Sequence, residues 1–360
     1  MTRTAKPQEK KVIPGYIKSL TGLKAIAMLL IFWQHAPIKN PPIDLGARMC
    51  ELLFICSGFL IGYKYLSAKI QKEATWQDSF RYLKKKALQL YPIHIICTII
   101  VFLFLGTAPI FSGESLIRLI FNLLFMQSWM PGSINYFSFN GVTWFVSSLL
   151  FCYFCSPFMC QVAKKAKRPL LLLLITCGIR ILLELIPFWF PGKFYTISFH
   201  VFPPIRALEF FIGILTAPVF MSFKKKIFEK VKHKCLLASL LEVITLTSII
   251  ILMIHFNGIW HRGTFVSLFL PPIFVFALDS GIISKILSIK PFMLFSKVQL
   301  YFFFMHWIVI RIVAITNILG GIRSRTIKTA IIFLIILAAS TLFYLITNKI
   351  SNYLKKRKAN

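Results

Sequence analysis

The sequence predicts an all-α integral membrane protein, a single bundle of about ten transmembrane helices. Of its 360 residues, 57% are hydrophobic and only 15% are charged. The mean hydropathy of +0.75 is far above that of a soluble domain of this size. Apolar stretches recur from residue 20 to residue 348, and the polar joints between them alternate between strongly basic and weakly charged. No part of this region has the composition of a soluble domain.

The spans follow from the length that a helix needs to cross a bilayer, roughly 20 mainly apolar residues. We expect them at residues 20–37, 47–66, 88–106, 142–162, 169–188, 203–221, 236–255, 263–280, 294–316 and 329–348. The chain then divides into a basic N-terminal segment 1–19, a transmembrane domain 20–348 and a basic tail 349–360. No small-residue cleavage site follows the first apolar run, so we expect a retained helix and no signal peptide.

The distribution of basic residues predicts the orientation. A net charge of +31 would fit nucleic-acid binding if the charges formed one patch. Most of the 42 Lys and Arg residues instead lie in alternate joints, within 3–24, 64–86, 164–168, 224–234, 285–297 and 349–358. Cytoplasmic loops carry such an excess, so we expect both termini in the cytoplasm and no nucleic-acid partner. Three basic residues between 323 and 328 depart from the pattern.

Residues 115–129 are apolar but are not expected to form an eleventh span. The stretch is shorter than a bilayer crossing, and counting it would invert every later loop against the charge pattern. Its Leu, Ile and Phe residues recur at helical spacing on one face. We therefore predict an interfacial or re-entrant helix on the outer side.

Ionisable residues inside apolar spans are costly and therefore informative. Arg180 and Glu184 are spaced i, i+4, and Arg206 and Glu209 are spaced i, i+3, so each pair could form a local ion pair. Most of the eight cysteines lie in or beside apolar runs, where cysteine behaves as a small hydrophobe. We expect no metal site.

His35 and Glu51 form a more informative combination. His35 lies near the outer end of the first predicted span and Glu51 near the outer start of the second, so both have nearly the same depth. A carboxylate facing an imidazole would fix its tautomer and stabilise the imidazolium formed when it accepts a proton. Arg48, one helical turn before Glu51, could instead pair with that carboxylate.

Six short stretches, spread over nearly the whole chain, carry a family resemblance. They begin at Leu20 (LTGLKAIAM), Glu51 (ELLFICSGFLI), Lys84 (KKKALQLYP), Trp144 (WFVSSLLFCY), Arg206 (RALEFFIG) and Tyr301 (YFFFMHW). In this order they resemble the motifs of membrane-bound acyltransferase family 3, the family of polysaccharide and lipopolysaccharide O-acyltransferases. The second stretch is the most specific.

The resemblance implies a catalytic base at His35, with Glu51 beside it. It also implies that acetyl-CoA binds at the basic cluster Lys84, Lys85 and Lys86, with Lys24. The sequence departs from the family at Lys24, where arginine is usual, at Glu51, where aspartate is commoner, and at Lys86 and Gln89, which replace two arginines. Lysine keeps a point charge but not the bidentate fork of arginine, so donor binding is expected from the cluster as a whole.

Contacts with the acyl acceptor or the thioester are expected from Arg206, Arg48, Trp144 and His306. His306 is as well suited to helix packing as to a second base. An acylated enzyme intermediate would need a nucleophile such as Ser57, whereas direct attack by the acceptor hydroxyl needs none.

The expected function is O-acetyl transfer from acetyl-CoA to a glycan or lipid-linked glycan of the cell envelope, such as O-antigen, capsule or exopolysaccharide. The expected location is the bacterial inner membrane, in contact with membrane lipid and possible envelope-assembly partners. A multi-span transporter or exporter of a glycan precursor would also carry intramembrane charges. It would show inverted-repeat symmetry in its hydropathy, which the sequence lacks. A non-enzymatic scaffold of an export complex would not explain the motifs.

Overall fold

A computed structural model describes residues 16–38, 44–68, 73–104, 113–189, 200–255 and 265–359. These residues form helices and no strand, which confirms the all-α prediction. Most of the predicted segment 1–19 lies outside the described residues. The long helices are α1 (Lys18–His35), α2 (Leu45–Ser67), α3 (Trp76–Phe104), α6 (Trp144–Lys165), α7 (Pro169–Trp189), α8 (Pro203–Lys226), α9 (Lys234–His255), α13 (Lys290–Thr316) and α14 (Arg325–Ala359).

Short helices connect the long ones. They are α4 (Gly113–Leu123), η1 (Gln127–Trp129), α5 (Ser133–Tyr136), η2 (Phe228–Lys230), α10 (Phe265–Leu268), α11 (Leu270–Phe276) and α12 (Ile282–Leu287). Within the described residues, eight helices are long and apolar enough to cross a membrane: α2, α3, α6, α7, α8, α9, α13 and α14. The protein is therefore a multi-pass membrane protein.

The two remaining predicted spans have a different form. The first corresponds to α1, whose N-terminal half carries Lys18 and Lys24 and is less apolar. The span predicted at 263–280 is divided between α10 and α11 at Phe269, with residues 263 and 264 outside the described part. Pro271 and Pro272 explain the division, because two consecutive residues without an N–H donor interrupt helical hydrogen bonding.

The stretch predicted to be interfacial contains α4, a helix of 11 residues. At about 1.5 Å per residue it is roughly half as long as the hydrocarbon core is thick. Leu116, Ile117 and Ile120 are exposed on its surface, whereas Asn122 is buried. Helix α4 ends at Leu123 and η1 follows at Gln127–Trp129, so the stretch is not one continuous helix, and its interfacial position stays a prediction.

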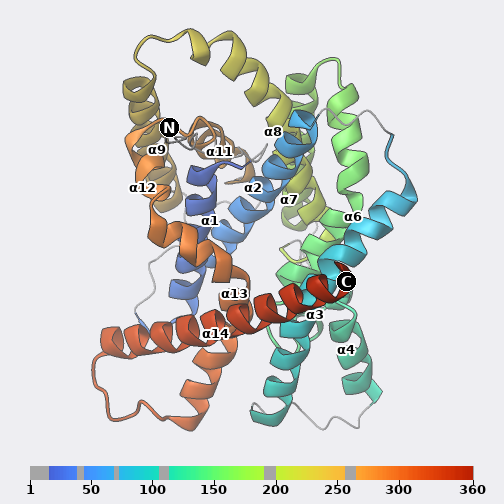
Figure 1. The fold of residues 1–360 in the computed structure, drawn as a ribbon, viewed down its shortest axis with the longest axis vertical. Helices are drawn as coiled ribbons and strands as arrows, with labels where there is room; N and C mark the ends of the chain where they lie inside the picture. Colours follow the sequence, from blue (N-terminus) through green and yellow to red (C-terminus); the bar gives the residue numbers. More distant parts are fainter. Residues whose placement is uncertain are drawn as a thin grey trace, which may run out of the picture.

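Figure 1 shows α1 and α2 side by side at the centre, with α6, α7 and α8 to one side and α9, α11 and α12 to the other. The last helix, α14, crosses in front of α13. The two are joined by a 2.9 Å hydrogen bond between Tyr301 Oη and Thr347 Oγ1 and by a tilted contact between the rings of Phe302 and Phe333, whose centroids are 5.6 Å apart. Helix α14 continues to Ala359, so residues 349–359 of the predicted tail prolong the last helix.

The tightest helix pair, α2 and α8, places the polar residues of the site. A Cβ atom on Gly58 of α2 would collide with the carbonyl oxygen of Phe210, and one on Gly213 of α8 would collide with that of Ile55. Glycine at both positions lets the two backbones touch, as small residues do in membrane helix pairs. This close approach brings Arg48 and Glu51 of α2 beside the charged turn of α8.

Candidate functional site

Four charged side chains form a buried network between α7 and α8. Arg206 Nη1 donates to both carboxylate oxygens of Glu209, at 2.6 and 2.5 Å. Arg180 donates to Glu209 Oε1 at 3.0 and 3.1 Å and to Glu184 Oε2 at 2.7 Å. All four residues are buried, and their charges cancel. Both ion pairs predicted from the sequence are therefore confirmed, and Glu209 joins them into one network.

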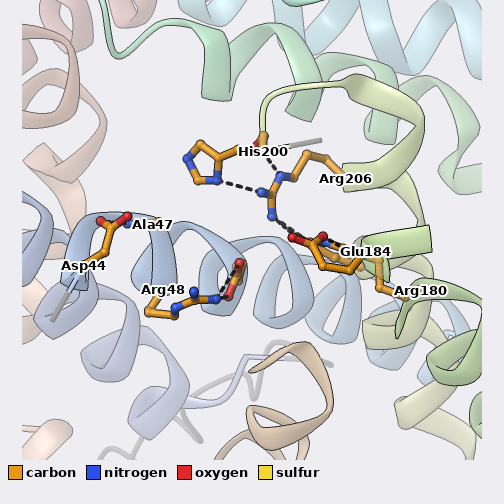
Figure 2. Close-up of polar contacts among 9 residues, drawn as sticks. Asp44, Ala47, Arg48, Arg180, Glu184, His200 and Arg206 are labelled. Atoms are coloured by element: carbon orange, nitrogen blue, oxygen red, sulfur yellow. Dashed lines mark hydrogen bonds and ion pairs between the residues drawn. The ribbon is translucent and has the colours of Figure 1, made fainter. Parts of the chain in front are cut away.

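Arg206 extends this network to His200, which precedes α8. Its Nη2 lies 2.8 Å from Nδ1 of His200, and its Nε donates to the His200 carbonyl oxygen at 2.6 Å (Figure 2). The His200 ring also packs against Trp144, with 4.6 Å between ring centroids. Arg206 thus fixes both the backbone and the imidazole of His200.

Glu51 pairs with Arg48. Arg48 Nη1 donates to the two carboxylate oxygens of Glu51 at 3.2 and 3.0 Å, and both residues are buried. Among the described residues, no hydrogen bond joins Glu51 to His35. Of the two partners that the sequence left open for Glu51, the structure selects Arg48, because a spacing of three residues on one helix places the two groups together.

His35 has a second histidine as its partner. Its Nδ1 lies 3.3 Å from Nε2 of His306, and Nδ1 of His306 lies 2.7 Å from the carbonyl oxygen of Phe303. A carbonyl oxygen only accepts, so the proton of neutral His306 is on Nδ1 and its Nε2 is an acceptor. His35 therefore donates from Nδ1, and its Nε2 is left with a lone pair. This is the tautomer of a general base.

A cavity of about 540 Å³ opens beside His35. It is lined by side chains of α1, α2, α6 and α13 and of the connecting segments, including His35, Asp44, Tyr136, Trp144, His200 and Trp307. Asp44 also caps α2 by accepting the Ala47 N–H at 3.2 Å. Two imidazoles and a carboxylate among aromatic rings give the cavity the composition of a site for a polar substrate.

The comparisons with known proteins agree with this geometry. A family model described as an acyltransferase domain matches residues 17–348. The chain belongs to this acyltransferase family. It is also similar to Acyltransferase MdmB of Streptomyces mycarofaciens, with 27% identity over 230 residues. That alignment covers 56% of this chain and 57% of the relative, so the chain spans little more than half of the relative's length. No solved structure matches the chain.

Within this acyltransferase-family chain, the predicted site residues separate into two groups. His35 and Trp144 line the cavity, and His306 and Arg206 stand directly behind His35 and His200. Arg48 forms an ion pair with Glu51. Neither residue lines the cavity, although their helix neighbours Ala47 and Cys50 do. The sequence interpretation missed His200 and Asp44, since both fall outside the predicted spans. The sequence feature that could have revealed His200 is its position six residues before Arg206.

The second group is the lysine cluster, defined here as Lys24, Lys64, Lys85 and Lys86, which come from α1, α2 and α3. The charges of the other three all act on Lys86. The Lys86 ammonium lies 5.6 Å and 5.1 Å from the ring centroids of Tyr82 and Tyr153. Lys84 and Lys85 are exposed on α3. Several ammonium groups close enough to act on one another create a positive potential that favours an anion.

A second cavity, of about 400 Å³, adjoins this cluster and includes Lys64 and Tyr82 in its wall. Its rim also carries Glu73, which forms an ion pair with Lys165. The hydrogen bond and charge of Lys165 hold the pKa of the Glu73 carboxyl below its ordinary value. Asp78 also lines this cavity and pairs with Arg81 at 3.2 Å, so both carboxylates of the wall have a basic partner.

No three His, Cys, Asp or Glu side chains are grouped to hold a metal ion in the part of the chain that the structure describes. The wall of the first cavity contains two imidazoles, those of His35 and His200. One of them, His35, presents a lone pair next to space for a substrate, and a base in that position can deprotonate a hydroxyl group.

Proposed function

We propose that this protein is an O-acyltransferase of the bacterial cytoplasmic membrane, which moves an acetyl group from acetyl-CoA to a hydroxyl of a cell-envelope glycan. The observation that carries the proposal is the hydrogen-bonded His35–His306 pair, which leaves the Nε2 lone pair of His35 beside a cavity of about 540 Å³. Membership of the acyltransferase family supports the reaction class.

The acceptor hydroxyl gives its proton to Nε2 of His35 while its oxygen attacks the thioester carbonyl carbon. The C–S bond then breaks, and the thiolate of CoA takes the proton from the His35 imidazolium. Ser57, the nucleophile that an acylated intermediate would need, is buried and is absent from the residues that line the cavity. Direct transfer is therefore the simpler route.

The donor binds at the lysine cluster. Lys24 and His35 lie on the same helix, separated by 11 residues and hence by roughly 16 Å along its axis. CoA has its phosphates at one end of a long flexible arm and the thioester at the other, which matches an anion site remote from a base. The phosphates rest on Lys24, Lys64, Lys85 and Lys86, and the arm runs along α1.

The acceptor enters at the opposite end of α1. Trp144 and Trp307 line that cavity, and aromatic side chains with a few polar groups suit the apolar faces and hydroxyls of a sugar. A glycan or lipid-linked glycan therefore approaches from the outer side, where envelope-assembly partners deliver it. Donor and acceptor thus reach His35 from opposite faces of the membrane.

The test uses the full chain in lipid nanodiscs, with release of free CoA from acetyl-CoA as the readout. We expect His35→Ala to abolish the release and His233→Ala, in the exposed joint after η2, to preserve it. Thermal unfolding of the three proteins controls for folding. Equal rates for wild type and His35→Ala would remove the proposal. Transport of a glycan without CoA release would favour the exporter function.

A further inference from the structure

His200 carries a tautomer opposite to that of His35. Its Nδ1 lies 2.8 Å from Nη2 of Arg206, and a guanidinium group only donates hydrogen bonds. Nδ1 of His200 is therefore an acceptor, and the proton of the neutral ring is on Nε2. Figure 2 shows this second nitrogen on the side of the ring that points away from Arg206.

The surroundings of Arg206 lock this tautomer in place. Arg206 is fully buried and is fixed by both oxygens of Glu209, which also accepts from Arg180. Moving the ring proton to Nδ1 would set two donors against each other and leave a buried guanidinium nitrogen without its acceptor. Contact with Trp144 and the bond to the His200 carbonyl oxygen further restrict the ring.

His35 and His200 line the same cavity. With these tautomers, His35 carries a lone pair on Nε2 and His200 carries an Nε2–H group, which are the two functions that acyl transfer to a hydroxyl needs. We propose that His200 is a further catalytic residue, whose Nε2–H donates to the carbonyl oxygen of the acyl donor. This assignment rests on the proposed acyltransferase function.

In the addition step, the new C–O bond forms between the acceptor oxygen and the thioester carbon. The hydroxyl proton moves to Nε2 of His35, and the π electron pair of the carbonyl moves onto its oxygen. Nε2–H of His200 donates a hydrogen bond to this oxyanion and keeps its own proton. When the C–S bond breaks, the carbonyl re-forms, and the thiolate takes the proton from His35. Atoms and electrons balance without a further reactant.

The buried network behind His200 gains a role in this scheme. Because Arg180, Glu184, Arg206 and Glu209 are fixed by one another, the donor needs no reorientation when charge develops on the substrate. A preorganised donor of this kind stabilises a transition state more than solvent does.

Two substitutions of His200 test the Nε2–H donor separately from the Nδ1 acceptor of the ring. The amide of asparagine overlaps the Nδ1 position, so His200→Asn keeps an acceptor for Arg206 and loses the donor into the cavity. Glutamine reaches the Nε2 position, so His200→Gln keeps a donor there. The matched control is His233→Gln, outside both cavities.

We measure CoA release from acetyl-CoA in nanodiscs as a function of pH, together with thermal unfolding. For His200→Asn we expect kcat to fall about 100-fold, the loss typical of one oxyanion donor, with KM for acetyl-CoA within about threefold. The acidic limb of the pH profile, set by His35, should keep its midpoint. His200→Gln should recover at least about tenfold of the lost rate, since a neutral N–H is the group required.

The outcomes distinguish the two proposals. Absence of His35-dependent CoA release in wild type overturns the proposed function and this inference with it. His35-dependent release combined with an unchanged kcat in His200→Asn overturns only the assignment of His200. Loss of the acidic limb in His200→Asn would make His200 the base and also overturn the assignment. Equal kcat losses in the Asn and Gln variants, with intact folding, would contradict the donor role.

Discussion

His35 Nδ1 lies 3.3 Å from His306 Nε2, and this contact joins α1 to α13 at the edge of the cavity. The hydrogen bond from His306 Nδ1–H to the Phe303 carbonyl oxygen, at 2.7 Å, fixes the tautomer of His306 and, through it, that of His35. His306 is fully buried, whereas His35 is partly exposed. We therefore predict that His306 is a positioning residue that acts through His35.

His306→Phe removes the acceptor for the Nδ1–H of His35 and preserves the size of the ring. We expect kcat for CoA release to fall at least about tenfold, because the base loses its fixed orientation and tautomer. His306→Gln, which keeps an oxygen acceptor, should retain more activity. A purely packing role would give the opposite order, with the phenylalanine variant closer to wild type.

Glu51 and Arg48 form a buried ion pair, so removing one partner leaves an uncompensated charge. Glu51→Leu should lower the stability by about 3–5 kcal/mol, and Arg48→Met in the same chain should restore a large part of it. Denaturant or thermal unfolding in nanodiscs measures both. Losses that simply add in the double variant would contradict the pairing.

Glu209 is the acceptor shared by two arginines. Glu209→Gln removes the charge that compensates Arg206 and Arg180, and we expect a loss of about 3–5 kcal/mol in unfolding free energy. The kcat should fall as well, because Arg206 no longer holds His200. The more exposed pair Arg118–Glu114 supplies the control, Glu114→Gln, with little change expected in either quantity.

Gly58 sets the distance between α2 and α8. Gly58→Ala would force its Cβ into the backbone of Phe210, so we expect a destabilisation of about 1–3 kcal/mol. Gly178 of α7 is the matched control, because a Cβ there would meet no atom within 4 Å. Gly178→Ala should leave the thermal midpoint unchanged or raise it slightly, since alanine favours helix. Equal effects at the two glycines would argue against the close contact.

Lys86 lies at the centre of the lysine cluster. Lys86→Met keeps the aliphatic part that packs on Tyr82 and Tyr153 and removes the charge. We expect KM for acetyl-CoA to rise about tenfold, as a charge-assisted bond to phosphate is lost, with kcat nearly constant. Lys232→Met, in the exposed joint before α9, is the control. A change in kcat alone would place Lys86 outside donor binding.

The sequence anticipated the helices more fully than it anticipated the contacts between them. Length and hydropathy placed α2, α3, α6 to α9 and α13 to within a few residues at most ends, although α3 begins 12 residues before the predicted start of its span. The division at Phe269 was missed because hydropathy does not register the two absent N–H donors of Pro271 and Pro272. Length and charge parity predicted that residues 115–129 do not form an eleventh span, and the helix there ends at Leu123.

The partners of the site residues depended on packing. Helical spacing gave Arg180–Glu184 and Arg206–Glu209, since both pairs lie within one helix. The same spacing permitted Arg48–Glu51, but similar depth also permitted His35–Glu51, and depth alone does not fix which faces meet. The approach of α1 to α13 brought His306 to His35, from 271 residues away in sequence.

The sequence by itself determined the membrane fold and the family resemblance, and it singled out His35 as the candidate base. It could do so because periodicity, charge and motifs are local properties of the chain. Only the tertiary structure decided that Glu51 pairs with Arg48, that His306 contacts His35, and that His200 lines the same cavity as His35. The physical reason is that hydrogen bonds act over about 3 Å, so the partner of each side chain depends on which of the groups within its reach the packing brings into contact.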